Sequence, residues 1–96
     1  MALAIEWTDT ADAQLDDIIE YLESNWTPKE IKQFFNKLEQ GIATIASHPT
    51  QHKKSLRKEH TYEYQLSPHT TIFYTYNSEK ATILLLWSNR MNPTNL

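Results

Sequence analysis

The last third of the chain contains two consecutive stretches that are rich in residues typical of β-strands. Residues 70–77 are almost all β-branched or aromatic, and residues 83–87 are apolar at every position. An uninterrupted apolar run of this kind is typical of a central strand with both faces covered. The polar, turn-forming residues 77–80 lie between the two stretches and predict a β-hairpin. The rest of the chain must therefore extend and cover this hairpin.

The start of the chain predicts a short strand and a first helix. Residues 3–7 are mostly apolar and end at an aromatic side chain, as a short strand does. Apolar side chains then recur at intervals of three and four from Ala11 to Trp26, with Thr8 as the expected N-cap. Acidic side chains occupy the other face of this helix, and we expect that face to be solvated rather than catalytic.

A second helix is predicted directly after the first. Thr27, Pro28 and Glu30 have the spacing of a capping box with a proline in its first turn. Apolar side chains then continue at helical spacing until Pro49 ends the helix. These side chains are Ile31, Phe34, Phe35, Leu38, Ile42 and Ile45. Gly41 lies inside the helix, where a close approach of the two helices would account for it.

The order of these elements predicts an α+β fold. Residues 62–66 alternate between apolar and polar side chains, and Ser-Pro-His at 67–69 separates them from the next strand. We therefore expect the order β-α-α-β-β-β, with an antiparallel αα-hairpin packed on one face of a small, mainly antiparallel sheet. A chain of this length forms a single domain, residues 1–96.

Composition excludes several kinds of protein. Cysteine is absent, which argues against a disulfide framework and a thiolate zinc site. Neither a signal peptide nor an apolar run of membrane-spanning length occurs, so we expect a soluble, cytoplasmic protein that does not bind membranes. His48 and His52 have the spacing of metal ligands, but Pro49 lies between them and no carboxylate motif accompanies them. We expect neither a metal nor a cofactor.

Charge is distributed unevenly along the chain. The formal net charge is −3, and residues 1–26 contain acidic side chains but no lysine or arginine. Bases gather later, in a basic cluster formed by Lys53, Lys54, Arg57 and Lys58. This cluster suits a phosphate-bearing or acidic partner, and a solvated loop beside a strand explains it equally well.

Spaced residues along nearly the whole chain form a further pattern. They comprise Trp7-x-x-x-Ala11-x-x-x-Leu15-x-x-Ile18, the proline that closes helix two, Ile72-x-Tyr74, and Trp87-x-x-Arg90-x-Asn92-Pro93. In this order they resemble the RelE/ParE superfamily of type II toxin–antitoxin toxins. The ending is similar to that of a branch that closes with Asp-x-Arg-x-Asn-Pro, but Ser88 stands here at the position of the aspartate.

The resemblance implies a toxin that a cognate antitoxin holds inactive, with a homodimer possible inside the complex. ParE-like members bind and inhibit DNA gyrase, whereas RelE-like members cleave messenger RNA on the ribosome. RNA cleavage needs proton-transfer groups and cations around the phosphate. If the chain is RelE-like, Arg57 and Arg90 are the candidate cations, and His60, Tyr62 or His69 are the candidates for proton transfer.

The sequence favours the ParE-like alternative. No histidine or tyrosine follows Trp87, and the acidic first third of the chain is a poor match for ribosomal RNA. The bases are then expected to contact a nucleic acid or protein partner; they are Lys53, Lys54, Arg57, Lys58 and Arg90. The RelE-like ribonuclease remains the first alternative, and a non-toxic protein-interaction domain of the same fold is the second.

Overall fold

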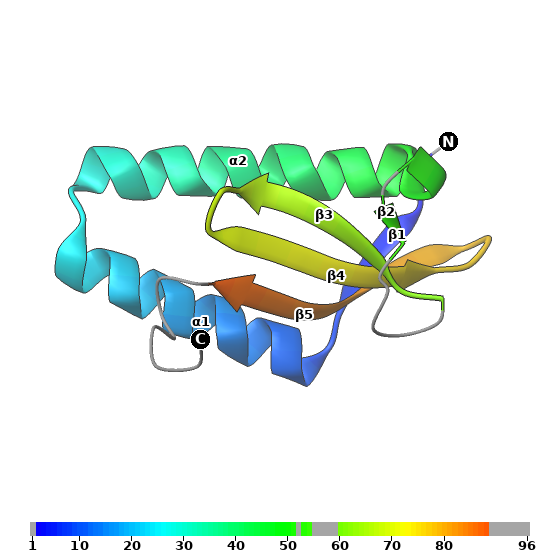
Figure 1. Cartoon of the computed structure of the whole chain (residues 1–96), viewed down its shortest axis with the longest axis horizontal. Coiled ribbons are helices and arrows are strands. Elements are labelled where there is room, and N and C mark those ends of the chain that lie inside the picture. The colour runs from blue at the N-terminus through cyan, green and yellow to red at the C-terminus, as the bar shows by residue number, and fades with distance from the viewer. Residues whose placement is uncertain (1, 52, 55–59, 89–96) are drawn as a thin grey trace.

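The computed structural model describes residues 2–51, 53–54 and 60–88 of the 96-residue chain. Its elements follow the predicted α+β order, with one additional short strand (Figure 1). They are β1 (Ala4–Trp7), α1 (Asp9–Asn25), α2 (Pro28–Ser47), the 3-10 turn η1 (Pro49–Gln51), β2 (Lys53–Lys54), β3 (Tyr62–Ser67), β4 (Thr70–Tyr76) and β5 (Lys80–Ser88). No helix in the described part is both long and apolar enough to cross a membrane.

The strands form one mixed sheet in the order β1-β5-β4-β3-β2. The β1–β5 pair is parallel, and the other pairs are antiparallel. The prediction that β5 is central is confirmed, since it lies between β1 and β4. Lys53 and Lys54, considered above as part of a solvated loop, form β2 and pair with Glu63 and Tyr62 at the sheet edge. A strand of two residues has no side-chain alternation from which it could be predicted.

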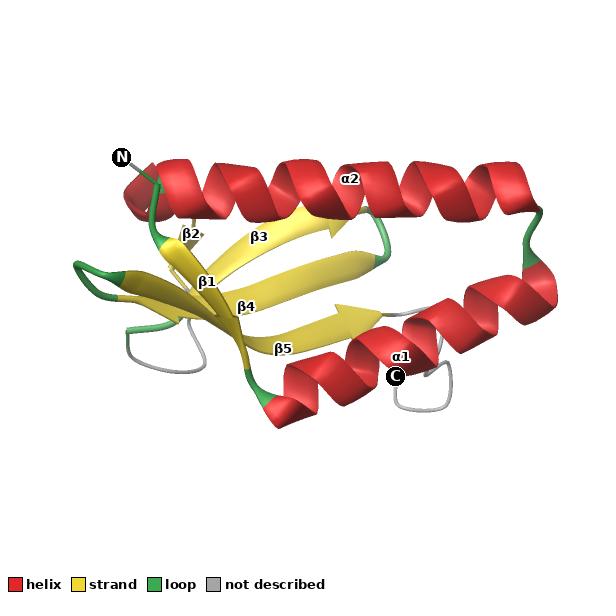
Figure 2. Ribbon diagram, turned by 180° about the vertical axis from the view of Figure 1, so that it is seen from behind, coloured by secondary structure: helices red, strands yellow, loops and turns green. Residues whose placement is uncertain are grey.

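Both helix starts are confirmed. The Thr8 hydroxyl accepts the backbone N–H of Ala11 at 3.1 Å, and Thr27 and Glu30 form the complete capping box. The two helices form the expected hairpin, but they diverge from their shared turn (Figure 2). Helix α1 packs mainly along β5, whereas α2 packs on β3 and also touches β1 and β5.

The core lies between the helices and one face of the sheet. Its fully buried side chains include Ile45 of α2, Ile72 and Tyr74 of β4, and Ile83 of β5. The prediction that both faces of β5 are covered is wrong, because both helices pack on the same face. Trp87, on the other face, retains 36% of its accessible surface. Only one face of the central strand is therefore part of the core.

Two details of α2 differ from expectation. Phe35 belongs to the predicted apolar stripe, yet 36% of it is exposed, because it lies at the margin of the buried face. Gly41 packs against β3 rather than against α1, so the expected close approach of the two helices is wrong. A Cβ atom at this position would lie 2.8 Å from Cε2 of Tyr64 and 3.1 Å from Cδ1 of Leu66.

Hydrogen bonds near a β-bulge connect β5 to the first turns of α1. The β4–β5 register shifts between Phe73 and Tyr74, which leaves an extra residue, Leu84, on β5. Beyond the bulge, the N–H of Leu86 donates to Oε1 of Gln14 at 2.8 Å. Before it, the Thr8 hydroxyl donates to the carbonyl of Ile83 at 3.0 Å. The same hydroxyl also lies 3.1 Å from the carbonyl of Leu84, so Thr8, the N-cap of α1, and Gln14 bind backbone groups of β5 at and beyond the bulge.

Candidate functional site

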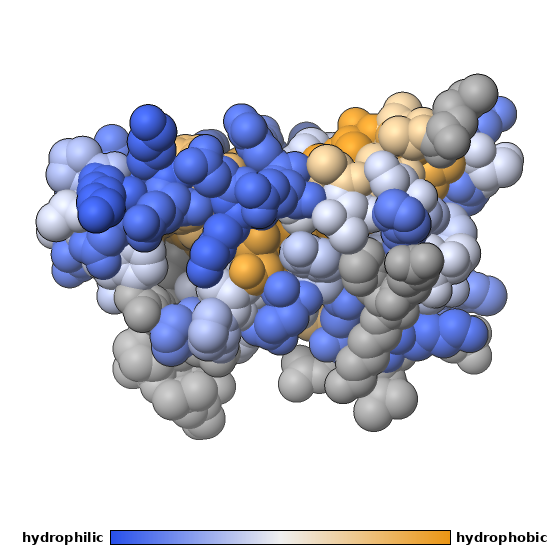
Figure 3. All heavy atoms as spheres, turned by 90° about the horizontal axis from the view of Figure 1, so that it is seen from above, coloured by the Kyte–Doolittle hydropathy of each residue, from blue (hydrophilic) through white to orange (hydrophobic). Residues whose placement is uncertain are grey.

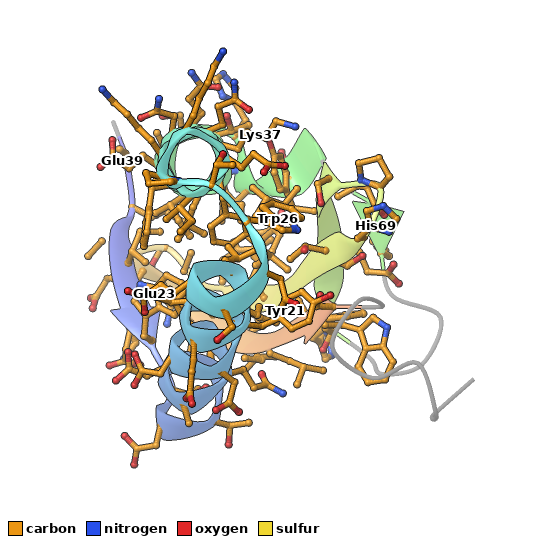
Figure 4. All side chains as sticks on the ribbon, turned by 90° about the vertical axis from the view of Figure 1, so that its left-hand side faces the viewer. Tyr21, Glu23, Trp26, Lys37, Glu39 and His69 are labelled. Atoms are coloured by element: carbon orange, nitrogen blue, oxygen red, sulfur yellow. The ribbon has the colours of Figure 1, made fainter. Side chains whose placement is uncertain are left out.

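A groove lies between the helix hairpin on one side and the β3–β4 turn and the end of β5 on the other. It has a volume of about 200 Å³, and its apolar lining includes Ile18 and Leu22 of α1 and Phe34 of α2. Trp26, in the turn between the helices, also lines it and lies between the helices and the sheet (Figure 4). Rigid helices and strands therefore form the walls, as they do in preorganised binding sites.

The rim of the groove carries polar groups from three separate elements. Lys37 of α2, His69 of the β3–β4 turn and Ser88 at the end of β5 all line it. Glu30 lines it too, but its carboxylate accepts the N–H and the hydroxyl of Thr27, at 3.1 and 3.2 Å. Among the described residues, Lys37 has no carboxylate partner. The ion pair found there joins Lys80 to Glu6. The groove therefore suits an apolar group that has a hydrogen-bond acceptor or an anion beside it.

A cluster of three tyrosines lies away from the groove, on β3 and β4. The ring centroid of Tyr62 is 5.7 Å from that of Tyr74 and 5.1 Å from that of Tyr76. The Tyr74 hydroxyl donates to the carbonyl of Pro49 at 2.7 Å, which ties the sheet to the end of α2. Burial raises the pKa of Tyr74, and a hydrogen bond with Tyr62 raises the pKa of Tyr76. Both phenols therefore stay protonated at neutral pH.

Of the residues that the sequence singled out, Lys54 pairs with Tyr62 across β2 and β3, whereas His69 lies at the other end of β3. Lys53 and Lys54 form β2, and the side chain of Lys54 is exposed. His60 is exposed just before β3 and has a φ of 58°, a left-handed conformation. Tyr62 belongs to the tyrosine cluster. The remaining candidates, Arg57, Lys58 and Arg90, lie outside the described residues.

The two histidines considered for proton transfer lie at opposite ends of β3. His60 precedes this six-residue strand and His69 follows it. A strand of this length spans roughly 20 Å, so the two imidazoles cannot act on one phosphate. Only His69 lines the groove. Within the described part of the chain, no group of three or more His, Asp or Glu side chains is arranged to hold a metal ion.

Lys37 was not singled out from the sequence. It follows Glu30 and Phe34 at helical spacing, so a groove on that side of α2 would place the three together. The sequence does not indicate which side of α2 lines a groove. That side is determined by the position of the β3–β4 turn, which contributes His69 to the groove.

Comparison with known proteins identifies the family. The model of the family described as the ParE toxin of the type II toxin–antitoxin system, parDE, matches residues 5–93. The match covers most of the chain, and the fold agrees with it. The chain belongs to the ParE toxin family of type II toxin–antitoxin systems, as the resemblance in its sequence predicted. Among curated proteins, none matches it.

Several solved structures share the fold at low sequence identity. The chromosomal ParDE toxin–antitoxin system from P. aeruginosa matches with a TM-score of 0.75 and 13% identity, over 91% of this chain and 96% of that one. The E. coli DinJ–YafQ toxin–antitoxin complex has a TM-score of 0.62 and 9% identity, over 94% and 96%. The YoeB dimer from Staphylococcus aureus has a TM-score of 0.62 and 14% identity, over 91% and 97%.

Proposed function

We propose that this toxin acts by binding and inhibiting DNA gyrase, and that a cognate antitoxin neutralises it. The observation that carries the proposal is the separation of the two candidate histidines within a chain that belongs to the ParE family. His60 and His69 lie at opposite ends of β3. An inhibitor that acts by contact needs no acid and no base, so this separation is compatible with its function.

The tyrosine cluster also supports a non-enzymatic function. A general base in RNA cleavage works best with a pKa near the working pH, whereas the pKa values of Tyr74 and Tyr76 are raised above the usual range. Tyr62 stacks on Tyr74 and hydrogen-bonds with Tyr76. Its phenol is thus held in a packing contact between the strands.

The groove offers a surface for contact with the target. Its apolar lining and the Lys37 ammonium combine an anchor pocket with a charge that has no described partner. Ser88, the last residue of β5, lines the groove, and Arg90 follows it by two residues in the sequence. We therefore assign Lys37, His69 and Arg90 to target binding.

A supercoiling assay with purified gyrase tests the proposal. The toxin should reduce supercoiling, and Arg90→Ala or Lys37→Ala should raise the half-inhibitory concentration about 5- to 30-fold, as the loss of an interface residue worth about 1–2 kcal/mol does. Lys29→Ala, on an exposed part of α2 outside the groove, is the matched control. Unchanged thermal stability of each variant would separate a contact role from a structural one.

The same experiments distinguish the ribonuclease alternative. Expression of the toxin without antitoxin should induce the DNA-damage response while translation at first continues. Cuts within codons of a translated message, lost in Arg57→Ala combined with Arg90→Ala, would instead establish the RelE-like activity and refute gyrase inhibition. A chain that is harmless in both assays would be a non-toxic interaction domain.

The antitoxin should be encoded in a short open reading frame next to this gene. The structures that share this fold include a ParDE toxin–antitoxin system and a DinJ–YafQ toxin–antitoxin complex, which supports an antitoxin partner. Co-expression of the neighbouring frame should abolish toxicity and yield a stable complex on size-exclusion chromatography. The same chromatography would show whether the toxin forms a dimer within the complex.

A further inference from the structure

Two buried hydroxyl groups lie next to each other in the lining of the groove. Thr70 begins β4 and Ser88 ends β5, and the two residues are paired across these strands. Both line the groove, although only 5% of Thr70 and 7% of Ser88 is exposed. Within the described part of the chain, neither hydroxyl has a hydrogen-bond partner. A buried hydroxyl without a partner costs free energy, so a group from outside the chain must supply one.

The charges around these hydroxyls favour an anion. Lys37 lines the same groove, and among the described residues its ammonium has no carboxylate partner. Glu30 is the acidic side chain among the described lining residues, but it precedes Lys37 by two helical turns, which is about 10 Å along α2. This distance exceeds the Debye length at physiological salt. The exposed carboxylate of Glu30 is therefore largely screened from an anion beside Lys37.

The apolar walls of the groove indicate that this anion is attached to an apolar group. Figure 3 shows mainly hydrophilic side chains over the N-terminal half of α2, so the apolar contact there is confined to the groove. Its volume of about 200 Å³ is below the usual range for drug-sized ligands and suits one or two amino-acid side chains. The net charge of −3 disfavours a nucleic acid as the source of the anion, because phosphate affinity depends on positive charge.

We propose that the groove binds a carboxylate side chain of the target protein together with an apolar side chain beside it. The inference rests on the proposed function and defines the chemistry of that contact. The hydroxyls of Thr70 and Ser88 donate to the carboxylate oxygens, and Lys37 neutralises the charge. Hydrogen bonds to a carboxylate are stronger than those to a neutral acceptor. The carboxylate therefore displaces water from the groove without leaving either hydroxyl unpaired.

Binding of small aromatic acids to the purified toxin tests this chemistry. Phenylpropionate should bind with a roughly millimolar dissociation constant, as ligands of this size do, and should shift the NMR signals of Thr70 and Ser88. Its uncharged analogue, phenylpropionamide, should bind at least about fivefold more weakly. Equal binding of the acid and the amide, or shifts only outside the groove, overturns the inference. Tighter binding of phenyl phosphate also overturns it, because a nucleic acid would then be the better partner.

The variant Thr70→Val removes one hydroxyl and keeps the shape of the side chain. Because that hydroxyl has no partner among the described residues, the thermal midpoint of the free toxin should stay the same or rise. The half-inhibitory concentration in the supercoiling assay should rise at least about fivefold. Thr75→Val, on the same strand but outside the groove, is the matched control and should change it less than about twofold. Ser88→Ala repeats the test on the second hydroxyl, with Ser78→Ala in the exposed hairpin turn as its control.

The outcomes separate this inference from the proposed function. If Thr70→Val and Ser88→Ala inhibit gyrase as strongly as the unchanged toxin, the inference is overturned and the proposed function stands. A lower thermal midpoint of Thr70→Val also overturns the inference alone, since the hydroxyl would then be bonded within the chain. An unchanged toxin that leaves gyrase fully active overturns both.

Discussion

Gly41 allows the ring of Tyr64 to lie directly against helix α2. Replacing a helical glycine with alanine usually stabilises a protein by about 1 kcal/mol. Here the new Cβ would lie 2.8 Å from Cε2 of Tyr64, and overpacking costs about 1–3 kcal/mol. We therefore expect Gly41→Ala to lower the free energy of unfolding, as measured by urea denaturation.

A second substitution shows whether the tyrosine ring causes this loss. In a Tyr64→Ala background the added Cβ has space, so Gly41→Ala should there cost less or become stabilising. Ala43→Gly, at an exposed position of α2, gives the helix-propensity term without the contact. If Gly41→Ala stabilised the otherwise unchanged protein, the contact with β3 would not explain the glycine.

Tyr74 should make stability depend on pH in the alkaline range. Its pKa is raised in the folded protein by burial, while in the unfolded chain it returns to about 10. Above about pH 10 the unfolded chain loses this proton first, so the free energy of unfolding should fall as the pH rises from there toward the folded pKa. Urea midpoints measured between pH 8 and 11 would reveal this decline.

The variant Tyr74→Phe separates ionisation from hydrogen bonding. It removes the bond to the carbonyl of Pro49, so at pH 8 it should be about 1 kcal/mol less stable than the unchanged protein. Between pH 10 and 11 its stability should decline less steeply, because one raised pKa is gone. Parallel declines in the two proteins would show that Tyr74 does not titrate there.

At the scale of elements, the contact between α1 and β5 depends on the bulge. Gln14 accepts the N–H of Leu86 at 2.8 Å, two residues beyond the extra residue Leu84. Gln14→Leu keeps a side chain of similar size but leaves that donor unpaired, so thermal or urea unfolding should show a loss of about 1–3 kcal/mol. Gln40→Leu, on the exposed part of α2, should change stability by less than about 0.5 kcal/mol.

Most elements of this fold could be predicted because their signals are local. The capping box at Thr27, the apolar periodicity of the two helices and the run before Trp87 depend on neighbouring residues in the sequence. Two errors involve distant neighbours: Gly41 packs on a strand instead of a helix, and the second face of β5, expected to be covered, leaves Trp87 exposed. Neither fact is encoded within a few residues, because each depends on where another element packs.

Less of the candidate site could be predicted, for the same reason. The sequence drew attention to bases that are adjacent along the chain, such as Lys53 and Lys54. The groove instead combines Lys37 of α2 with His69 of the β3–β4 turn. These residues lie far apart in the sequence and line the same groove only in the folded structure. His69 was noted because histidine can transfer protons, but nothing in the sequence placed it beside Lys37.

At the scale of the whole molecule, the acids of α1 should keep this toxin off free RNA. They lie exposed along the helix and include Asp12, Asp16, Asp17 and Glu20. Nonspecific binding depends on positive charge, so a single-stranded RNA should bind no more tightly than about 100 μM at physiological salt. Fluorescence anisotropy measures this. Replacing the four acids with amides should tighten binding, whereas micromolar, salt-sensitive binding by the unchanged protein would favour the ribonuclease alternative.

The parallel pairing of β1 with β5 joins segments that the ribosome produces at different times. The Thr8 hydroxyl binds the carbonyl of Ile83, 75 residues further along the chain. At usual elongation rates about 4–15 s separate the synthesis of these residues. During that interval the helix hairpin exists without the central strand on which its apolar side chains pack. The groove, which Ser88 at the end of β5 helps to line, can therefore form only after β5 has emerged from the exit tunnel.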